Sequence, residues 1–180
     1  MPDVARLRIE VFRDFPYLYD GDLDSEARYI ASFAASLNAV VVAAFDGDAV
    51  VGVSTAAPMA TQMADVTAPF RARGEDLSRT FYFGESVLSR AYRGTGIGVR
   101  FFEEREAQAR RCGAAVAAFC AVARERDHPA RPRDYVPLDA FWQRRGFAVA
   151  PGLLCQLSWR EIGADDESPK AMQFWTKRLS

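Results

Sequence analysis

Histidine and cysteine, which supply many catalytic and metal sites, are scarce in this sequence of 180 residues. His128 is the single histidine, so the sequence is short of the ligands of a zinc site and of the side chains of a Ser-His-Asp triad. The three cysteines, Cys112, Cys120 and Cys155, are widely separated and show no metal-ligand spacing. We therefore expect reduced thiols and no metal, with Cys120 serving as a small buried core residue rather than as a nucleophile.

A strong net charge and a long apolar run are also missing. The formal charge of −1 gives no field that would attract a nucleic-acid backbone. No window approaches the roughly 20 apolar residues that span a bilayer, and the first residues show no basic-then-apolar signal. These absences predict a cytoplasmic protein that binds neither nucleic acid nor membrane.

What the sequence does contain is typical of a globular protein. Apolar residues make up 49% and charged residues 26%, which excludes disordered and collagen-like chains. The length favours one buried core over two. We therefore predict a single domain over residues 1–180.

Hydrophobic spacing at the start of the chain predicts two helices. Apolar residues at positions 4, 7, 11 and 15 recur at helical spacing, and Pro16 ends this pattern. A second helix is predicted to begin near Ser25, with Leu37 among its inward-facing residues.

A hairpin is predicted next. Two β-rich runs, 39–45 and 49–57, flank the turn residues 46–48, where Gly47 supplies a positive φ. A helical connection over 61–73, interrupted by Pro69, leads to the following strand.

A strand, a glycine-rich turn, a helix and a second strand follow one another in the middle of the chain. The first strand covers 80–89, the helix runs to about Cys112, and the small apolar residues 114–122 form the second strand. Such a βαβ unit places its two strands in parallel. The remaining predicted elements are a proline-rich surface loop over 124–137, a short helix over 138–145, and two antiparallel closing strands over 153–160 and 171–178.

The turn between the parallel strands has the composition of a phosphate-binding loop. Gly94, Gly96 and Gly98 would let backbone N–H groups approach phosphate oxygens at the start of a helix. No Gly-Lys-Ser/Thr follows, which excludes a Walker loop, and the G-x-G-x-G spacing excludes the dinucleotide fingerprint. A tight turn without a ligand and a phosphate site unrelated to coenzyme A are the alternatives.

The GNAT superfamily, the Gcn5-related N-acetyltransferases, carries an Arg/Gln-x-x-Gly-x-Gly/Ala signature that resembles Arg93-Gly94-Thr95-Gly96-Ile97-Gly98. The order of the predicted elements and the segment 141–147 also resemble this family over nearly the whole chain. The resemblance implies an α/β fold with a mixed, mostly antiparallel sheet and helices on both faces. Its central parallel βαβ unit would contain strands 4 and 5 of the family, which splay apart.

The resemblance further implies that acetyl-CoA is the acyl donor and that backbone groups hold it. The amides from Arg93 to Gly98 would bind the pyrophosphate, and Leu88 would hydrogen-bond the pantetheine arm. The complete set assigned to the cofactor is Val87, Leu88, Ser89, Arg93, Gly94, Thr95, Gly96, Ile97, Gly98 and Trp142.

Two departures from the family pattern stand out. The chain begins almost at the first helix, where the family has a short strand, so a sheet of six strands is expected. Trp142 occupies the position where many members have a tyrosine that protonates the departing thiolate. Because indole is a poor acid, the usual general acid is missing.

Acyl transfer to an alkylammonium requires a proton acceptor, because a pKa of about 10.4 keeps the amine protonated at neutral pH. Glu85 is the predicted base, and an exposed strand carboxylate or one tied to Arg90 is the alternative reading. The Leu88 amide would stabilise the oxyanion. Tyr135 is the predicted acid.

The acceptor pocket is predicted to be walled by Tyr17, Tyr19 and Asp20, with Tyr135 opposite, and this lining favours a cationic amine. The predicted function is direct transfer of an acetyl group to a primary amine of a small molecule or peptide. A catalytically inactive coenzyme A-binding sensor or partner module is the alternative. The resemblance is also compatible with a homodimer through the closing strands.

Overall fold

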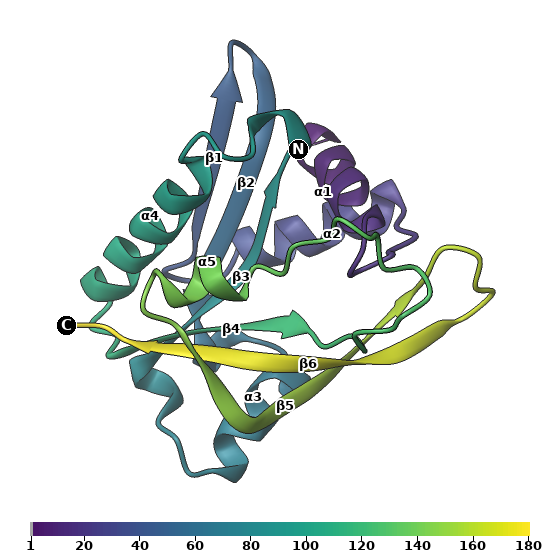
Figure 1. Ribbon diagram of the computed structural model, residues 1–180. Helices are drawn as coiled ribbons and strands as arrows, with labels where there is room; N and C mark the ends of the chain where they lie inside the picture. The colour runs from purple at the N-terminus through teal and green to yellow at the C-terminus, as the bar shows by residue number, and fades with distance from the viewer. Residues whose placement is uncertain (1) are drawn as a thin grey trace.

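The computed structural model describes residues 2–180 and shows a six-stranded sheet with helices on both faces (Figure 1). The strands are β1 (Val40–Asp46), β2 (Ala49–Pro58), β3 (Thr80–Leu88), β4 (Val116–Val122), β5 (Ala148–Arg160) and β6 (Glu167–Arg178). The α-helices are α1 (Pro2–Arg13), α2 (Leu23–Ala34), α3 (Ala64–Ala72), α4 (Ile97–Arg111) and α5 (Asp139–Gln143). None of these helices combines the length and the apolar character needed to cross a membrane.

The strands lie side by side in the order β1-β2-β3-β4-β6-β5. Only β3 and β4 run parallel, and every other neighbouring pair is antiparallel. The predicted mixed sheet of six strands, with the βαβ unit at its centre, is therefore confirmed. The strand that corresponds to the family's fourth is the third here.

The second helix starts and ends earlier than its apolar spacing predicts. Asp22 caps α2 by accepting a hydrogen bond from the Ser25 amide at 2.9 Å. The helix ends at Ala34, so Leu37 falls in the connection to β1 and is 79% exposed. The prediction that Leu37 faces inward is wrong, because the apolar pattern continues beyond the last helical turn.

The connection between β2 and β3 contains α3, whose helix includes Pro69. The predicted interruption is therefore wrong. Proline at this position removes one helical hydrogen bond, to the Asp65 carbonyl, and Asp65 lies at the exposed start of the helix, where water can replace the bond. Phe70 and Val66 are buried and anchor α3 against the sheet.

Alternate residues of β3 point to opposite faces of the sheet. Phe81 and Phe83 pack with Phe102 of α4, whereas Tyr82 packs with Phe70 of α3. Helix α1 lies over β2 and β3, where Leu7 contacts Val53 and Val87, and α4 forms the opposite layer (Figure 1). The central strand is thus covered on both sides.

A bulge in β3 changes this alternation. Ser54 pairs with Ser86 and Ala56 with Phe83, so Thr55 alone stands opposite Gly84 and Glu85. The extra residue turns the Glu85 side chain from the α4 face, where Phe83 lies, to the face covered by α1 and α2. A side chain at Gly84 would place its Cβ 2.5 Å from the Thr55 hydroxyl, which explains the glycine.

Candidate active site

The two parallel strands part soon after they begin. Their ladder contains only the pairs Thr80–Val116, Phe81–Ala117 and Tyr82–Ala118, although β3 continues to Leu88 and β4 to Val122. Beyond these pairs a gap opens between the two strands. The splay that the family resemblance implies is therefore present.

Backbone groups on both sides of this gap are free to bind a ligand. The Ser89 amide donates to the Val51 carbonyl at 2.9 Å. Because bonded and non-bonded pairs alternate in an antiparallel ladder, the N–H and C=O groups of Ser86 and Leu88 point away from β2 and into the gap. On β4, the bond from Ala123 to Ala171 similarly directs the Val122 backbone into the gap.

Leu88 is thus the member of the predicted trio Val87, Leu88 and Ser89 that offers a free amide. The Ser89 amide is taken by β2, and the Val87 side chain is fully buried beside Val53.

The turn from Arg93 to Gly98 presents a row of backbone N–H groups. Gly94 and Gly96 have φ values of 81° and 92°, which side chains other than glycine rarely adopt. Within residues 2–180, no backbone or side-chain acceptor takes the amides of 94–98. These amides precede or begin α4, where the helix dipole favours an anion. The Arg93 amide differs, because it donates to the Arg90 carbonyl at 3.2 Å.

Side chains brace this turn without covering it. The Thr95 hydroxyl donates to the Tyr92 carbonyl at 2.6 Å, and the Tyr92 hydroxyl donates to Asp46 at 2.6 Å. A Cβ added at Gly94 or Gly96 would meet no atom within 4 Å, so the space above the amides is open. The Arg93 side chain is largely exposed and lies 4.0 Å from Asp14.

Trp142 belongs to an aromatic cluster. Its ring lies 5.0 Å from that of Phe119 and 5.1 Å from that of Trp175, both in T-shaped geometry. The residue beside the glycine turn is instead Phe141, whose ring would lie 3.4 Å from a Cβ at Gly98. The sequence prediction did not include Phe141, although it directly precedes Trp142 on the same short helix.

Glu85 is buried among charged and polar side chains. The Tyr29 hydroxyl of α2 donates to its Oε2 at 2.8 Å, and the Arg8 guanidinium of α1 lies 3.0 Å from the same oxygen. Glu85 is therefore neither exposed nor tied to Arg90, which corrects the alternative reading. The other oxygen, Oε1, is buried and has no hydrogen-bond partner in the described part of the chain.

Arg8 is shared between two buried carboxylates. It donates to Glu26 of α2 as well as pairing with Glu85, and all three residues are at most 7% exposed. Burial opposes the guanidinium charge, but the carboxylates outweigh that effect and raise the pKa of Arg8. The guanidinium also lies 4.4 Å from the centre of the Tyr29 ring. Arg8 thus fixes the position of Glu85.

Tyr17 is partly buried in an aromatic cluster, and its role as an acceptor contact stays a prediction. Its ring packs between those of Phe12 and Trp159, at 4.7 and 5.9 Å. Burial raises the pKa of its hydroxyl, whose neighbours include Cys120 and the Val122 amide. Since the Val122 backbone faces the gap, the Tyr17 hydroxyl lies at the end of the gap.

The other residues of the first loop are fixed to the end of β5. Tyr19 forms an isolated bridge with Glu161. Asp20 pairs with Arg13 at 3.1 Å and with Arg160 at 3.0 Å, so its charge is already balanced. Their role as acceptor contacts stays a prediction.

Tyr135 lies on the proline-rich loop, as the sequence predicts. Its ring meets that of Phe15 edge-on at 4.7 Å, and Arg131 stacks on it at 4.9 Å. Burial raises the pKa of Tyr135. Through Phe15, Tyr135 contacts the loop that carries Tyr17.

Cys120 is a core residue, as predicted. It is 7% exposed, and its sulfur lies 3.2 Å from the Tyr82 hydroxyl.

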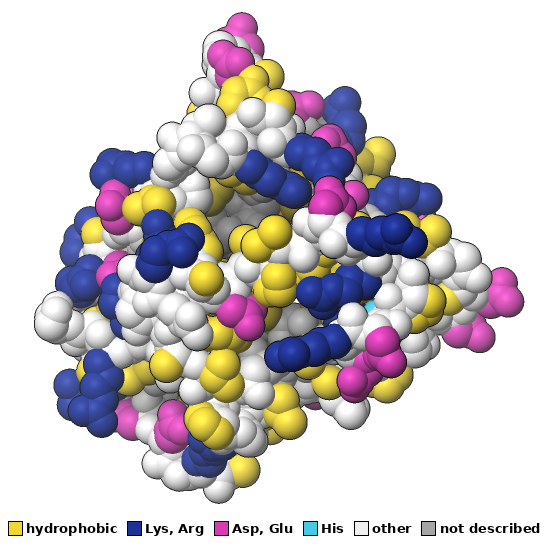
Figure 2. Space-filling view, in the orientation of Figure 1, with side chains coloured by type: hydrophobic (Ala, Val, Ile, Leu, Met, Phe, Trp, Pro, Cys, Tyr) yellow, Lys and Arg dark blue, Asp and Glu magenta, His cyan; other side chains and the backbone are white. Residues whose placement is uncertain are grey.

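The surface around this region is hollow and basic. Figure 2 shows a depression near the centre of the face seen in Figure 1, with Lys and Arg side chains gathered around it. Positive charge at the rim of a depression favours an anionic ligand.

Comparisons with known proteins give matches only at the level of structure. No protein-family model matches the sequence, and no curated protein sequence matches it. A Gcn5-related N-acetyltransferase from Kribbella flavida is 19% identical, with a TM-score of 0.62 over 99% of this chain and 91% of that chain.

Two acetyltransferases of known class are similarly close. A ribosomal-protein-alanine N-acetyltransferase from Brucella melitensis is 16% identical, with a TM-score of 0.63 over 99% of this chain and 93% of that one. An aminoglycoside 6'-N-acetyltransferase complexed with coenzyme A is 17% identical, with a TM-score of 0.59 over 100% and 93%.

These similarities, together with the splayed strands and the glycine turn, define the class of fold. The chain has the fold of the GNAT superfamily, the Gcn5-related N-acetyltransferases.

Proposed function

We propose that this protein is an N-acetyltransferase that moves an acetyl group from acetyl-CoA to a primary amine. The observation that carries the proposal is the row of unpartnered amides from Gly94 to Gly98 at the start of α4. A diphosphate needs such a row, because each N–H can donate to an oxygen without a counter-charge from a side chain. Arg93 would add positive charge beside the phosphates.

The backbone of β3 would hold the rest of the cofactor. The pantetheine arm would enter the gap between β3 and β4 and pair with the free groups of Leu88 as if it were a strand. This placement brings the thioester carbonyl close to the Leu88 amide, which would stabilise the oxyanion. Phe141 and Trp142 would form the wall on the other side of the cofactor.

Glu85 is the proposed proton acceptor. Its Oε1 is buried and lacks a donor, whereas its Oε2 is held by Tyr29 and Arg8. A carboxylate that is held through one oxygen and has no hydrogen-bond donor at the other can take a proton from an ammonium that reaches it, directly or through a water molecule. The neutral amine then attacks the thioester carbon, so that a C–N bond forms and the C–S bond breaks.

The departing thiolate needs a proton, and Tyr17 is our first candidate for the donor. Its hydroxyl has the gap-facing Val122 amide as a neighbour, and burial keeps it protonated. Tyr135 remains the second candidate, because its ring packs on Phe15 at the start of the same loop. Either phenol would replace the tyrosine that the family carries at the position of Trp142.

The acceptor is proposed to be a small-molecule or peptide amine. The names of two structural neighbours point to an aminoglycoside and to an alanine of a ribosomal protein, and both name an N-acetyl transfer. Two buried carboxylates, Glu26 and Glu85, share the single guanidinium of Arg8. The cluster therefore has an excess of negative charge, which would attract a cationic amine. Tyr19 and Asp20 are proposed to line the entrance.

Titration calorimetry with acetyl-CoA, combined with a thiol-release assay on a panel of amines, tests this function. We expect micromolar binding and thiol release with at least one aminoglycoside or peptide. Glu85→Gln should lower kcat about 100-fold and leave the Kd for acetyl-CoA unchanged. Glu26→Gln, the matched control, should retain a substantially larger kcat.

The alternative function is a coenzyme A sensor without catalysis. It is motivated by Trp142, whose ring is packed between Phe119 and Trp175 and offers no acidic hydroxyl. Tight acetyl-CoA binding with no thiol release from any amine would support the sensor. Binding of free ADP without binding of acetyl-CoA would contradict both functions.

A further inference from the structure

The two edges of the sheet differ in how well they are protected. The edge strand β5 contains Pro151, changes register between Val149 and Leu154, and contacts α3. Proline, bulges and covering helices are the devices that stop an edge from pairing with another strand. The opposite edge, β1, also contacts a helix, α4, and its ladder with β2 shifts register between Ala44 and Phe45. It contains no proline, however, and among residues 2–180 no segment pairs with its outer side.

The strand β1 is also apolar along nearly its whole length. Residues 40–45 are Val, Val, Val, Ala, Ala and Phe, and the first charge is that of Asp46. Val41 is 43% exposed and Phe45 is 63% exposed. Free edge strands normally carry lysine or another charge, so an uncharged edge with exposed apolar side chains is typical of a strand that pairs.

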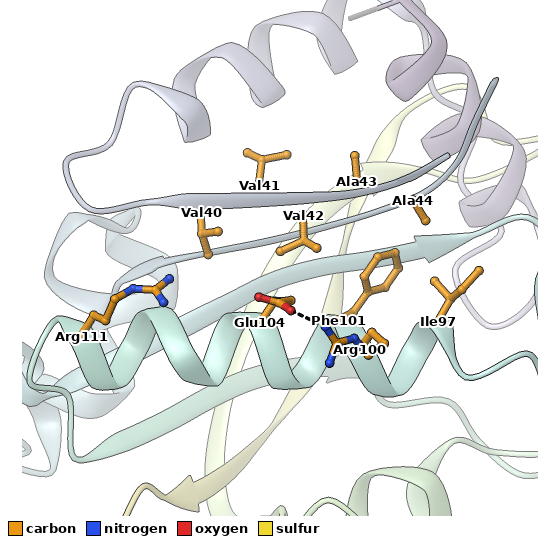
Figure 3. Close-up of a pocket in the computed structure, with 10 residues that line it drawn as sticks. All are labelled: Val40, Val41, Val42, Ala43, Ala44, Ile97, Arg100, Phe101, Glu104 and Arg111. Atoms are coloured by element: carbon orange, nitrogen blue, oxygen red, sulfur yellow. Dashed lines mark hydrogen bonds and ion pairs between the residues drawn. The ribbon is translucent and has the colours of Figure 1, made fainter. Parts of the chain in front are cut away.

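A groove beside β1 extends this surface. Figure 3 shows Val40, Val42 and Ala44 pointing toward α4, and Val41 and Ala43 pointing away from it. The space between β1 and α4 has a volume of about 500 Å³. Its lip on α4 is formed by Arg100 and Glu104, which pair with each other at 2.8 Å. Arg111 of α4 also lines the groove, so an added strand would meet an apolar floor and a rim with one further positive charge.

We propose that β1 pairs with β1 of a second copy of this chain, in antiparallel orientation, to form a homodimer with a continuous sheet. A two-fold contact brings the same patch together twice, so the strand must be complementary to itself. About an axis at Val42, Val41 faces Ala43 of the second copy and Val40 faces Ala44 of the second copy. Val40 and Val41 then lie opposite alanines, Val42 lies opposite Val42 of the second copy, and no like charges meet.

The weak overall charge supports the same occupant. A formal charge of −1 per chain gives little repulsion between two copies. Pairing also covers Val41 and supplies the missing partners of the outward N–H and C=O groups. The dimer contact lies at the opposite edge of the sheet from the closing strands β5 and β6.

Sedimentation of the full chain from about 1 to 200 µM tests the proposal, a range chosen because small interfaces bind weakly. We expect a reversible shift toward twice the chain mass of 20.0 kDa. Val41→Lys should abolish this shift, whereas Leu154→Lys, on the exposed face of β5, should leave it unchanged. Both variants should bind acetyl-CoA as the parent does, which separates this proposal from the proposed function.

Two outcomes would overturn the dimer. One is a monomer at every concentration, and the other is a dimer lost in Leu154→Lys and kept in Val41→Lys, which would place the contact at the closing strands. Hydrogen exchange of the unmodified chain covers the case in which Val41→Lys fails to fold. Exchange at residues 40–46 should slow at least threefold between the lowest and highest concentrations, and equal rates would contradict the proposal.

Discussion

Glu85 lies on β3 and the glycine turn follows that strand, but the turn and the cluster around Glu85 are built from different groups. The turn offers main-chain amides from Gly94 to Gly98 that have no partner within residues 2–180, with open space at Gly94 and Gly96. The cluster consists of side chains, and most of its polar atoms are already paired, Arg8 with Glu26 and Glu85, and Tyr29 with Glu85. One region is prepared to receive a ligand, and the other is nearly complete without one.

This difference separates binding from chemistry. The conformation of a short turn depends only on the local sequence. Its backbone amides can bind any anion of suitable size and shape. The cluster joins segments that are far apart in the chain, and it positions a single free oxygen, Oε1 of Glu85. We therefore expect changes in the cluster to alter stability and turnover, and changes in the turn to alter cofactor affinity.

The largest effect should come from Arg8→Met, which leaves Glu26 and Glu85 buried without their cation. Removing one partner of a buried ion pair costs about 3–5 kcal/mol, so the free energy of unfolding should fall by that amount in urea titrations. Arg6→Met is the matched control, because Arg6 pairs with Asp3 at the exposed surface and should contribute under about 1 kcal/mol. Equal losses in the two variants would show that the cluster is not an ion-pair network.

Next in size is Tyr17→Phe, which removes the proposed acid and leaves the ring packing intact. We expect kcat to fall about 100-fold with an unchanged Kd for acetyl-CoA, measured by thiol release and calorimetry. Tyr135→Phe is the control and should lower kcat far less. The reverse pattern would assign the proton to Tyr135 instead.

A smaller effect is expected from Gly96→Ala in the glycine turn. The new methyl group enters the open space above the amides and should weaken acetyl-CoA binding about 10- to 30-fold, close to 1.4–2 kcal/mol. Gly47→Ala, in the β1–β2 hairpin, is the control because it also has a positive φ and open space. Both variants should lose similar stability, and only Gly96→Ala should lose affinity.

The smallest effect concerns stability in alkali. Burial, followed by the neighbouring Cys120, raises the pKa of Tyr82 well above its usual value. The neutral phenol is favoured in the folded state, so its contribution is complete below the unfolded pKa of about 10 and is lost as the pH rises further. Tyr82→Phe should therefore flatten the decline above pH 10 by up to about 1.4 kcal/mol per pH unit.

The matched variant for this measurement is Tyr92→Phe, in the turn that leads to α4. The pKa of Tyr92 is also raised, by its hydrogen bond to Asp46, but the side chain is only partly buried. Its removal should flatten the alkaline decline of stability far less than Tyr82→Phe does. Equal flattening in both variants would show that burial is not the cause.

Elements that depend on local sequence could be predicted. The Gly47 hairpin, the βαβ unit and the glycine turn follow from periodicity and from residues that tolerate a positive φ, and the structure contains all three. Leu37 was misplaced because apolar spacing does not show where a helix ends. Pro69 was misread because one lost hydrogen bond at an exposed carbonyl does not stop α3.

The side-chain half of the site could not be predicted in the same way. The bulge at Gly84 depends on Thr55 of the neighbouring strand, and it alone turns Glu85 toward α1. The pairing of Glu85 with Arg8 joins residues far apart in the chain, and no spacing rule connects them. The packing of the Tyr17 ring on Trp159 also joins residues far apart in the chain, so the sequence alone does not show it.

A crystal structure of the complex with coenzyme A tests the central claim most directly. We predict that the diphosphate oxygens lie within about 3.2 Å of the amides of Gly94 to Gly98, and that the pantetheine arm pairs with Leu88 in the gap. A complex in which these amides are empty, or in which coenzyme A binds elsewhere on the molecule, would contradict the account.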